Sequence, residues 1–395
     1  MLQRRRAFPR RTTIAACCLV LYTLGGLAQP GLLSARQVGP GVLHAKFILP
    51  GPLTIDVLSV SLREPTVHLE TYRPDGLTET TTQAAANDRP GHRVLAAVNA
   101  DFFSFQTGWP VGNQMVNGTW VLGTRSARSH LAIDGAGRPF IERITFAGSV
   151  SAPDGSSFAI TGVNVPHRTD PLILYTCYRG RTTSEDSCLS AYTLRFLDTA
   201  WTAGDTLRAI ATGRATDEDV PIAPGTAVLA VTADTAAAFL TQRIHDGDTL
   251  RIMPGTRPLL RGITQIIGGC GRFLAGGRNV TDSTSRWEGI TEKFTGARHP
   301  RTFVGFDRDT TTLYLCTVDG RRSTSIGMTF ADMASFLLTL GAAEGFNLDG
   351  GGSTTMVVQG RIVNTPSDAT GERPVANTLQ VISTTADSLL APPRR

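Results

Sequence analysis

The sequence predicts an α+β protein with mixed, mostly antiparallel sheets and few helices. Short apolar segments separated by turn residues recur through most of the chain, which is typical of β-rich folds. Residues 330–340 instead carry apolar side chains at helical spacing, with Thr329 and Asp332 positioned as a capping box. Two predicted strands lie on each side of this helix, so the expected C-terminal order is β-β-α-β-β.

The first 28 residues have the features of an export signal. Five arginines precede a mainly apolar stretch, residues 12–27. This stretch is too short for a comfortable membrane span. Gly26-Leu27-Ala28 offers a small-x-small cleavage site, and Arg5-Arg6-Ala7-Phe8 resembles the core of a twin-arginine signal. We expect an exported protein, periplasmic or extracellular, with no stable membrane span after signal removal. The alternative is an uncleaved membrane anchor.

The basic balance of the chain comes from this leader. The full chain has a net charge of +5, and the leader holds five arginines and no acidic residue, so the mature protein is neutral overall. No basic run with interleaved aromatic residues follows the leader. The sequence therefore gives no indication of a nucleic-acid partner.

Four cysteines remain after the leader: Cys177, Cys188, Cys270 and Cys316. An even number of cysteines in an exported protein suggests disulfides, and three pairings are possible. We favour Cys177–Cys188 with Cys270–Cys316, because the first pair would close one short loop. The alternative is a set of free, buried thiols. The cysteine spacings do not fit a zinc site.

Residues 29–92 are expected to form an N-terminal β-rich segment. Residues 29–41 have the Pro and Gly content of a linker, and residues 78–87 fit a short helix. Three strand patterns lie between them, at 42–49, 53–62 and 67–72.

Residues 93–382 are expected to form the principal domain. Within it, residues 141–260 predict a β-rich subdomain with one short helix at 234–243. Residues 287–297 are polar and predict a loop that could cover a binding site. The tail, residues 383–395, is expected to be disordered.

Two strand ends carry polar side chains suited to a site. The apolar run 93–98 ends in Asn99-Ala100-Asp101-Phe102-Phe103, which offers an amide, a carboxylate and two aromatic rings. The run 345–348 ends in Asp349-Gly350-Gly351-Gly352-Ser353-Thr354-Thr355. Glycines permit positive φ and close approach of backbone N–H groups to an anion. The alternatives are an Asx turn over an aromatic core at the first strand end and a tight hairpin turn at the second.

The glycine-rich turn differs from two familiar catalytic motifs. It lacks the Lys that precedes the Ser or Thr of a nucleotide-binding P-loop. Ser353 does not lie in a Gly-x-Ser-x-Gly nucleophile elbow.

Seven motifs follow one another in order along roughly residues 93–382. They are Asn99-Ala100-Asp101-Phe102-Phe103, Ile267-Gly268-Gly269, Arg301-Thr302 with Gly305, Val318-Asp319-Gly320-Arg321, Gly327-Met328-Thr329, the turn from Asn347 to Met356, and Pro366-Ser367-Asp368 through Gly371-Glu372-Arg373-Pro374-Val375-Ala376-Asn377. This ordered set resembles the phosphodiester glycosidase family. Ala100 and Asp101 depart from the Gly-Gly that is commoner in the family, and Cys270 interrupts a strand end that is usually glycine-rich.

The resemblance implies cleavage of a sugar-1-phosphodiester to a free sugar and a phosphomonoester. Asp349 is then the expected base or nucleophile, with Asp101 and Asp319 as candidates for a second carboxylate. The groups expected to bind the substrate are Asn99, Arg301, Thr302, the amides of Gly350, Gly351 and Gly352, Ser353, Thr354, Arg373 and Asn377. Among them, Arg301 offers planar paired donors suited to phosphate, and Asn99 and Asn377 are assigned to sugar hydroxyls.

No cofactor and no metal ligand are expected, although Asp349 could instead bind Ca²⁺, which takes oxygen ligands. Two other functions remain open. One is a non-catalytic module that binds an envelope glycopolymer. The other is a metal-dependent phosphodiesterase, against which the scattered positions of the seven histidines argue.

Overall fold

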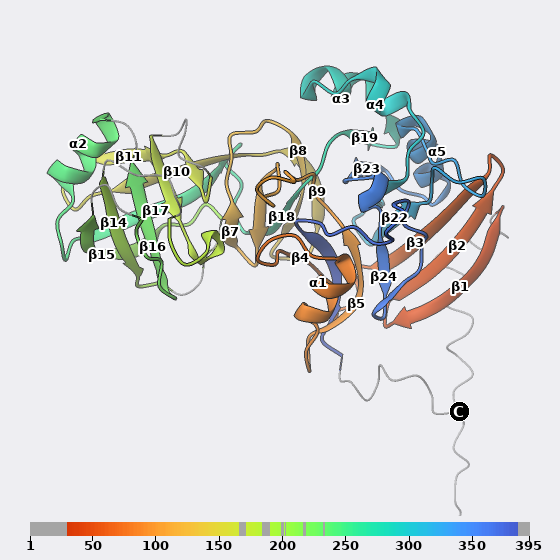
Figure 1. The fold of residues 1–395 in the computed structure, drawn as a ribbon, viewed down its shortest axis with the longest axis horizontal. Coiled ribbons are helices and arrows are strands. Elements are labelled where there is room, and N and C mark those ends of the chain that lie inside the picture. The colour runs from red at the N-terminus through yellow and green to blue at the C-terminus, as the bar shows by residue number, and fades with distance from the viewer. Residues whose placement is uncertain are drawn as a thin grey trace, which may run out of the picture.

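The computed structural model describes residues 30–165, 171–183, 190–198, 201, 203–215, 219–231 and 234–385. Within them, four sheets and five α-helices form an elongated molecule (Figure 1). All strand pairings between named strands are antiparallel except that of β12 (Gly162–Val163) with β13 (Leu172–Tyr175). The predicted α+β class with mostly antiparallel sheets is confirmed.

The main sheet joins the beginning of the described chain to its last third. Its order is β1-β2-β3-β22-β21-β23-β19-β20. These strands are β1 (Leu32–Gly39), β2 (Val42–Leu49), β3 (Leu53–Ser61), β22 (Thr312–Val318), β21 (Arg301–Phe306), β23 (Glu344–Asn347), β19 (Arg272–Ala275) and β20 (Arg278–Asn279).

A second sheet packs against one face of the main sheet, with the order β25-β24-β5-β26-β4. Its strands are β25 (Arg361–Ile362), β24 (Met356–Val358), β5 (Arg93–Asn99), β26 (Thr378–Ser383) and β4 (Val67–Tyr72). Alternation along β22 shows the layering. Leu313 and Leu315 enter the core between the two sheets, while Tyr314, Cys316 and Val318 enter the core under α5 (Phe330–Thr339).

α1 (Thr80–Asn87) covers the outer face of the second sheet, where Ala84 packs with Ala97 and Val357. The layers are therefore α5, main sheet, second sheet and α1.

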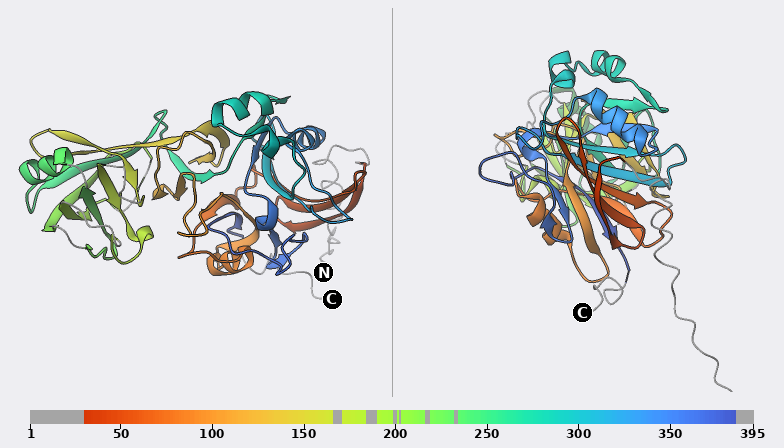
Figure 2. Two further views of the ribbon diagram at one scale, coloured as in Figure 1. Left: turned by 45° about the horizontal axis from the view of Figure 1, so that its top comes forward. Right: turned by 90° about the vertical axis from the view of Figure 1, so that its right-hand side faces the viewer.

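Two further sheets extend the molecule. A bridging sheet has the order β7-β6-β18-β8-β9, and a lobe sheet has the order β11-β10-β17-β15-β14-β16-β13-β12. The bridging strands are β7 (Thr119–Leu122), β6 (Gln114–Val116), β18 (Ile263–Gly268), β8 (Ser129–Asp134) and β9 (Pro139–Arg143). The remaining lobe strands are β11 (Ser157–Ile160), β10 (Thr145–Ser151), β17 (Thr249–Arg257), β15 (Leu207–Ala215), β14 (Ser190–Phe196) and β16 (Thr226–Val231). The lobe sheet and α2 (Asp234–Arg243) stand apart from the main sheet in both Figure 1 and Figure 2.

Two local predictions were wrong. Residues 29–41 are not only a linker, because β1 pairs with β2 along the sheet edge from Leu32 to Gly39. The partly polar sequence of β1 does not indicate a strand, and pairing of its backbone with β2 stabilises it. The predicted loop 287–297 includes the end of α3 (Thr281–Glu288) and all of α4 (Glu292–Gly296). The Thr291 side chain caps α4 by accepting from the Phe294 N–H.

The predicted Cys270–Cys316 disulfide is also wrong, because both residues are free and buried. Cys316 pairs with Phe303, Phe303 pairs with Asn347, and the Asn347 carbonyl accepts from the Cys270 N–H. Three strand spacings of about 4.8 Å separate the two backbones, which is well beyond the Cα–Cα reach of a disulfide. The other proposed pair includes Cys188, which lies outside the described residues.

None of the helices in the described part of the chain is long and apolar enough to cross a membrane. The predicted export signal lies outside the described residues, as does most of the predicted C-terminal tail.

The capping box of α5 allows a test of the fold. The Thr329 hydroxyl accepts from the Asp332 N–H, and the Asp332 carboxylate accepts from the Thr329 N–H. We expect Thr329→Ala to lower the free energy of unfolding by about 1 kcal/mol, measured by urea denaturation. Ser335→Ala, at an exposed position of the same helix, is the control and should change stability by less than about 0.5 kcal/mol. Equal effects of the two substitutions would contradict a role for the cap.

Candidate active site

The Asn99 side chain connects the ends of three strands. Its Oδ1 accepts from the Thr302 hydroxyl (2.7 Å) and from the Thr355 N–H (3.1 Å). Its Nδ2 donates to the Asp349 carbonyl (2.7 Å), and the Asp349 N–H donates to the Ala100 carbonyl (2.7 Å). Asn99 is fully buried. These bonds position the two strand ends singled out in the sequence beside each other. Because Asn99 is fully buried, its side chain is not exposed to the sugar hydroxyl assigned to it.

Asp101 lies in a cradle made by two glycines. Its Oδ2 accepts from the Gly112 N–H at 2.7 Å, and its backbone N–H donates to Asn377 Oδ1 at 2.9 Å. A Cβ on Gly268 would lie against the Asp101 carboxylate, so a side chain there would displace it. Asp101 Oδ1 is buried and has no hydrogen-bond partner among the described residues. One carboxylate oxygen is thus anchored and the other is left for a ligand or a proton.

The two carboxyl groups have different proton affinities. The pKa of Asp101 is raised to about 8, chiefly by burial and also by the nearby Asp349 charge, while the amides of Gly112 and Phe102 act in the opposite direction. Burial also raises the pKa of Asp349, to about 6, against the effects of the Ser353 hydroxyl, the Gly350 amide and the Arg373 charge. At neutral pH Asp101 is therefore mostly protonated and Asp349 mostly ionised.

The amides of the glycine-rich turn do not form an open row for an anion. Two of them are bonded within the protein. Gly351 has φ +62° and its N–H donates to the Pro300 carbonyl at 2.9 Å, while the Gly350 amide serves the Asp349 carboxylate. Gly352 has Arg373 and Asp368 directly over its Cα, leaving no room for a Cβ. Ser353 accepts from Arg373 Nη1 at 3.5 Å, and the Thr354 hydroxyl is buried without a partner among the described residues.

Three arginines lie near the glycine-rich turn or one of the two carboxyl groups. Arg373 lies near Asp349 and is oriented by Asp368, with which it makes two contacts of 2.7 Å. Arg321 is exposed, and its Nη2 lies 3.1 Å from the position of a Cβ on Gly351. The Arg128 charge acts on Asp101, and Arg128 makes no ion pair within the described chain. The site therefore combines two carboxyl groups with a surplus of positive charge.

Arg301 does not reach this site. It is 1% exposed, and its guanidinium donates to the carbonyls of Met328 (3.0 Å), Phe294 (2.8 Å) and Ala297 (2.9 Å). The group also lies over the rings of Phe294 and Phe330. With Nε and Nη2 bonded to main-chain carbonyls and the side chain buried, Arg301 holds the α4 segment against α5 and is not available for the phosphate contact that we assigned to it.

Three other predicted residues have scaffold positions. Asp319 is buried and accepts from the Thr365 N–H at 2.9 Å and from Asn364 Nδ2 at 3.4 Å; burial raises its pKa. It supports the turn from behind through Asn364, which donates to the Thr354 carbonyl. Thr302 is bonded to Asn99, and Asn377 Nδ2 donates to Gln114 Oε1 at 3.0 Å. The structure brings Asp101 and Asp349 together and leaves Asp319 outside the pair.

Sequence reasoning missed several groups at the site. Arg321 had a signal, because it is the last residue of the motif Val318-Asp319-Gly320-Arg321. Arg128 had none, because it lies in an irregular segment before β8. Phe105 is 70% exposed, its ring centroid lies 4.9 Å from that of Phe103, and Arg373 lies over it at 5.7 Å. It offers an apolar face beside the charged groups.

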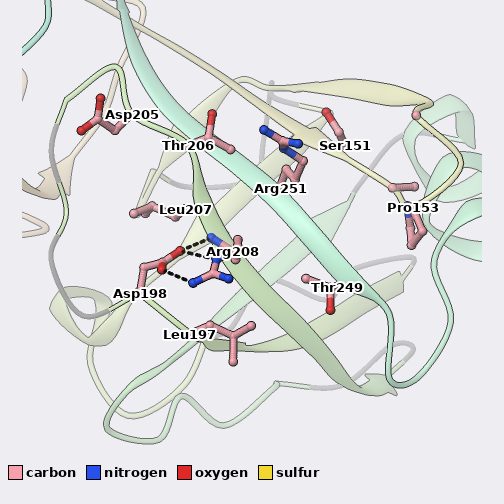
Figure 3. Close-up of a pocket in the computed structure, with 12 residues that line it drawn as sticks. Ser151, Pro153, Leu197, Asp198, Asp205, Thr206, Leu207, Arg208, Thr249 and Arg251 are labelled. Carbon is pink, nitrogen blue, oxygen red and sulfur yellow. Dashed lines mark hydrogen bonds and ion pairs between the residues drawn. The ribbon is translucent and has the colours of Figure 1, made fainter.

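A large surface hollow lies elsewhere, on the lobe sheet (Figure 3). It has a volume of about 1130 Å³ and is lined by strands β10, β15 and β17. Its Asp198 is held by Arg208 in an exposed ion pair of 2.9 Å. This hollow has no buried carboxyl pair, so we place the candidate active site at Asp101 and Asp349 instead.

Comparisons with known proteins agree with the predicted resemblance. Residues 206–382 match the family model described as phosphodiester glycosidase. The chain is 44% identical over 84 residues to the SPbeta prophage-derived uncharacterized protein YomE of Bacillus subtilis, covering 21% of this chain and 13% of that protein. It is 32% identical over 110 residues to mouse N-acetylglucosamine-1-phosphodiester alpha-N-acetylglucosaminidase, covering 28% of this chain and 21% of the mouse enzyme. The aligned parts therefore span 13% and 21% of the lengths of these two relatives.

The fold is shared with a hypothetical protein from Synechocystis of known crystal structure. The TM-score is 0.70 at 18% identity, and the match covers 90% of this chain and 64% of the other.

The buried Asp101 allows a test by stability. Its carboxyl keeps a proton up to about pH 8 in the folded protein but releases it near pH 3.8 in the unfolded chain. Its contribution to stability is therefore full below pH 3.8 and is lost as the pH rises toward 8. Relative to wild type, the free energy of unfolding of Asp101→Asn should rise by up to about 1.4 kcal/mol per pH unit between pH 5 and pH 7. Urea denaturation at three pH values measures this, with Asp198→Asn as the surface control. A difference that is flat with pH would contradict the protonated state of Asp101.

Proposed function

On the premise that residues 206–382 of this chain belong to the phosphodiester glycosidase family, we propose that the protein hydrolyses the glycosidic bond of a sugar-1-phosphodiester. The products are a free sugar and a phosphomonoester. One feature supports the proposal beyond the family match: two neighbouring carboxyl groups lie in different surroundings, so that burial raises the pKa of Asp101 to about 8 and that of Asp349 to about 6.

Asp349 is the ionised member and acts at the anomeric carbon. As a base it takes a proton from the attacking water, while the bond between C1 and the phosphate oxygen breaks and its electron pair stays on that oxygen. As a nucleophile it would form the C1–O bond itself, and water would release the sugar in a second step. Phosphate is a good leaving group, so only weak acid assistance is required.

Asp101 is the protonated member and has two uses in this reaction. It can give its proton to the leaving phosphate oxygen, and while neutral it does not repel the substrate anion. Its free Oδ1 is consistent with this use, because the anchored Oδ2 leaves the other oxygen for a proton or a ligand. A second ionised carboxylate beside Asp349 would oppose the binding of a phosphodiester.

Arg373, Arg321 and Arg128 supply the positive charge for the phosphate. Guanidinium groups pair with two phosphate oxygens at once, which favours an anionic substrate over a neutral glycoside. The exposed ring of Phe105, beside Arg373, offers an apolar surface for one face of the sugar. The Asp101 carboxylate lies so close to Gly112 and Gly268 that neither position has room for a side chain.

The N-terminal leader predicted from the sequence makes an exported location part of the proposal. An exported enzyme of this kind would meet glycosyl phosphodiesters of the cell envelope or the medium. Detection of a mature protein that begins after Ala28 in the exported fraction would support it, whereas an intact leader on a membrane-bound chain would contradict it.

The products of the reaction provide the direct test. We expect purified mature protein, incubated with a panel of UDP-sugars and methyl-phospho-sugars, to produce a phosphomonoester signal in phosphorus NMR together with free reducing sugar. Asp349→Asn should lower kcat by roughly 10²- to 10⁴-fold, because it removes the only ionised carboxylate of the pair. Asp198→Asn, which removes a surface carboxylate on the lobe sheet, is the matched control and should keep full turnover.

Other outcomes of this assay would replace the proposal. A sugar phosphate in place of a free sugar would mean that the P–O bond breaks, as in a phosphodiesterase. Intact ligand that binds without turnover would mean a glycopolymer-binding module. Full turnover by Asp349→Asn would remove the central assignment.

The dependence of rate on pH tests the roles of the two carboxyls. We expect kcat/KM to follow a bell with limbs near pH 6, where Asp349 ionises, and near pH 8, where Asp101 loses its proton. Because the phosphodiester itself does not titrate in this range, the limbs report on the protein. Asp101→Asn should lower the rate and remove the alkaline limb. An unchanged alkaline limb in that variant would show that another group controls it.

A further inference from the structure

Three potential metal ligands gather on the second sheet, away from the candidate active site. His68 and Glu70 lie on β4 two residues apart, so their side chains share one face of the strand. His92 directly precedes β5. Strand β26 lies between β4 and β5, and its Ile382 pairs with both His68 and Val94, which brings His92 level with the β4 pair. Figure 1 shows β4 and β5 beside α1.

The distances among these side chains suit a shared ion. One ligand atom from each residue lies within 4.8 Å of the others. His68 Nε2 is 3.9 Å from Glu70 Oε2, and His92 Nε2 is 3.7 Å from Glu70 Oε1. Around a tetrahedral ion with bonds of about 2.0–2.1 Å, ligand atoms lie about 3.3 Å apart. Small side-chain rotations would therefore close the site without movement of the backbone.

Glu70 is held in place by a surrounding polar network. Asn87 donates to its Oε1 at 3.0 Å and Asn117 to its Oε2 at 3.3 Å, and Gln265 donates to Asn117 at 2.6 Å. Such supporting bonds orient a metal-binding carboxylate. Glu70 itself is 5% exposed, so its charge is buried at the centre of the cluster.

The two histidines of the cluster have ring nitrogens or exposed surface that a cation could use. His92 Nε2 is buried and accepts or donates no hydrogen bond among the described residues, although it faces Glu70. The His68 side chain is 41% exposed, which leaves a path for an ion and for water to fill the remaining coordination positions. The charges of Arg89 and Asp88 both act on His92. Arg89 Nη1 donates to the carbonyl and to Oδ1 of Asn87.

We propose that His68, Glu70 and His92 bind a divalent transition-metal ion, with Zn²⁺ as the best fit. Two imidazoles and one carboxylate form a ligand set that suits Zn²⁺ and related ions, whereas Ca²⁺ and Mg²⁺ prefer oxygen ligands alone. The site is separate from the carboxyl pair. His92 and Asn99 lie at opposite ends of β5, about 20 Å apart along a strand of this length.

The ion has a structural role in this proposal. It cross-links β4, at the edge of the second sheet, to the chain that enters β5, and β5 positions Asn99 and Asp101 at its other end. Binding to the folded state alone would stabilise the protein in proportion to the ion concentration. It supplies no step of the hydrolysis.

Zinc titration of tag-free, chelator-treated mature protein tests the site. We expect calorimetry to give about one equivalent of bound Zn²⁺ and a rise in the unfolding temperature. His92→Ala and His68→Ala should each weaken binding by roughly 10- to 100-fold and remove most of the temperature shift. His68 is half exposed, so its variant should fold even where a buried change fails, and circular dichroism checks this.

The matched control is His245→Ala, which removes a histidine that also faces one carboxylate, Asp248, at 3.6 Å but belongs to no group of three potential metal ligands within the described residues. It should bind zinc like wild type. The proposal is overturned if wild type binds no stoichiometric zinc, or if the His68 and His92 variants bind it as tightly as the control. The hydrolysis assay with and without chelator is a separate readout, since loss of zinc binding would leave the carboxyl chemistry untouched.

Discussion

The bonds of the Asn99 side chain are the constraint on which the candidate active site depends. Asn99 ends a strand of the second sheet, Thr302 belongs to the main sheet, and Asp349 and Thr355 flank the glycine-rich turn that leads from one sheet to the other. One buried amide thus fixes the relative position of two sheets at the edge where both carboxyl groups emerge. Removing the Asn99 amide would leave its buried partners unpaired, and an unpaired buried polar group costs more free energy than the bond itself contributes.

Burial then decides the chemistry of the two aspartates. Asp101 is enclosed by Gly112 and Gly268, whereas Asp349 is partly open and adjoined by Arg373. The same type of side chain therefore holds its proton at one position and releases it at the other. The glycines act here through the space they leave. At Gly268 and Gly352 a single added carbon would displace the Asp101 carboxylate or the Arg373–Asp368 pair.

The burial of a polar side chain in this protein indicates whether it supports the fold or can contact a ligand. Arg301 is enclosed and satisfied by three carbonyls, so it stabilises the α4 segment. Arg321 is exposed beside Gly351, and the Arg128 charge acts on Asp101. The histidines show the same division. His130 is buried and accepts from the Asn113 N–H, while His68 and His92, distant in sequence, converge on Glu70.

Local pattern alone determined much of this protein: the α+β class, α1, α2 and α5 with its capping box, most strands of the main and second sheets, and the two motifs that carry Asp101 and Asp349. These features depend on short-range periodicity and turn chemistry, which the sequence displays directly. Only the tertiary structure decided the strand β1, the helices α3 and α4, the separation of Cys270 from Cys316, the burial of Arg301 and the gathering of His68 with His92. Each of these depends on which distant segments become neighbours, and strand order, not local sequence, sets that distance.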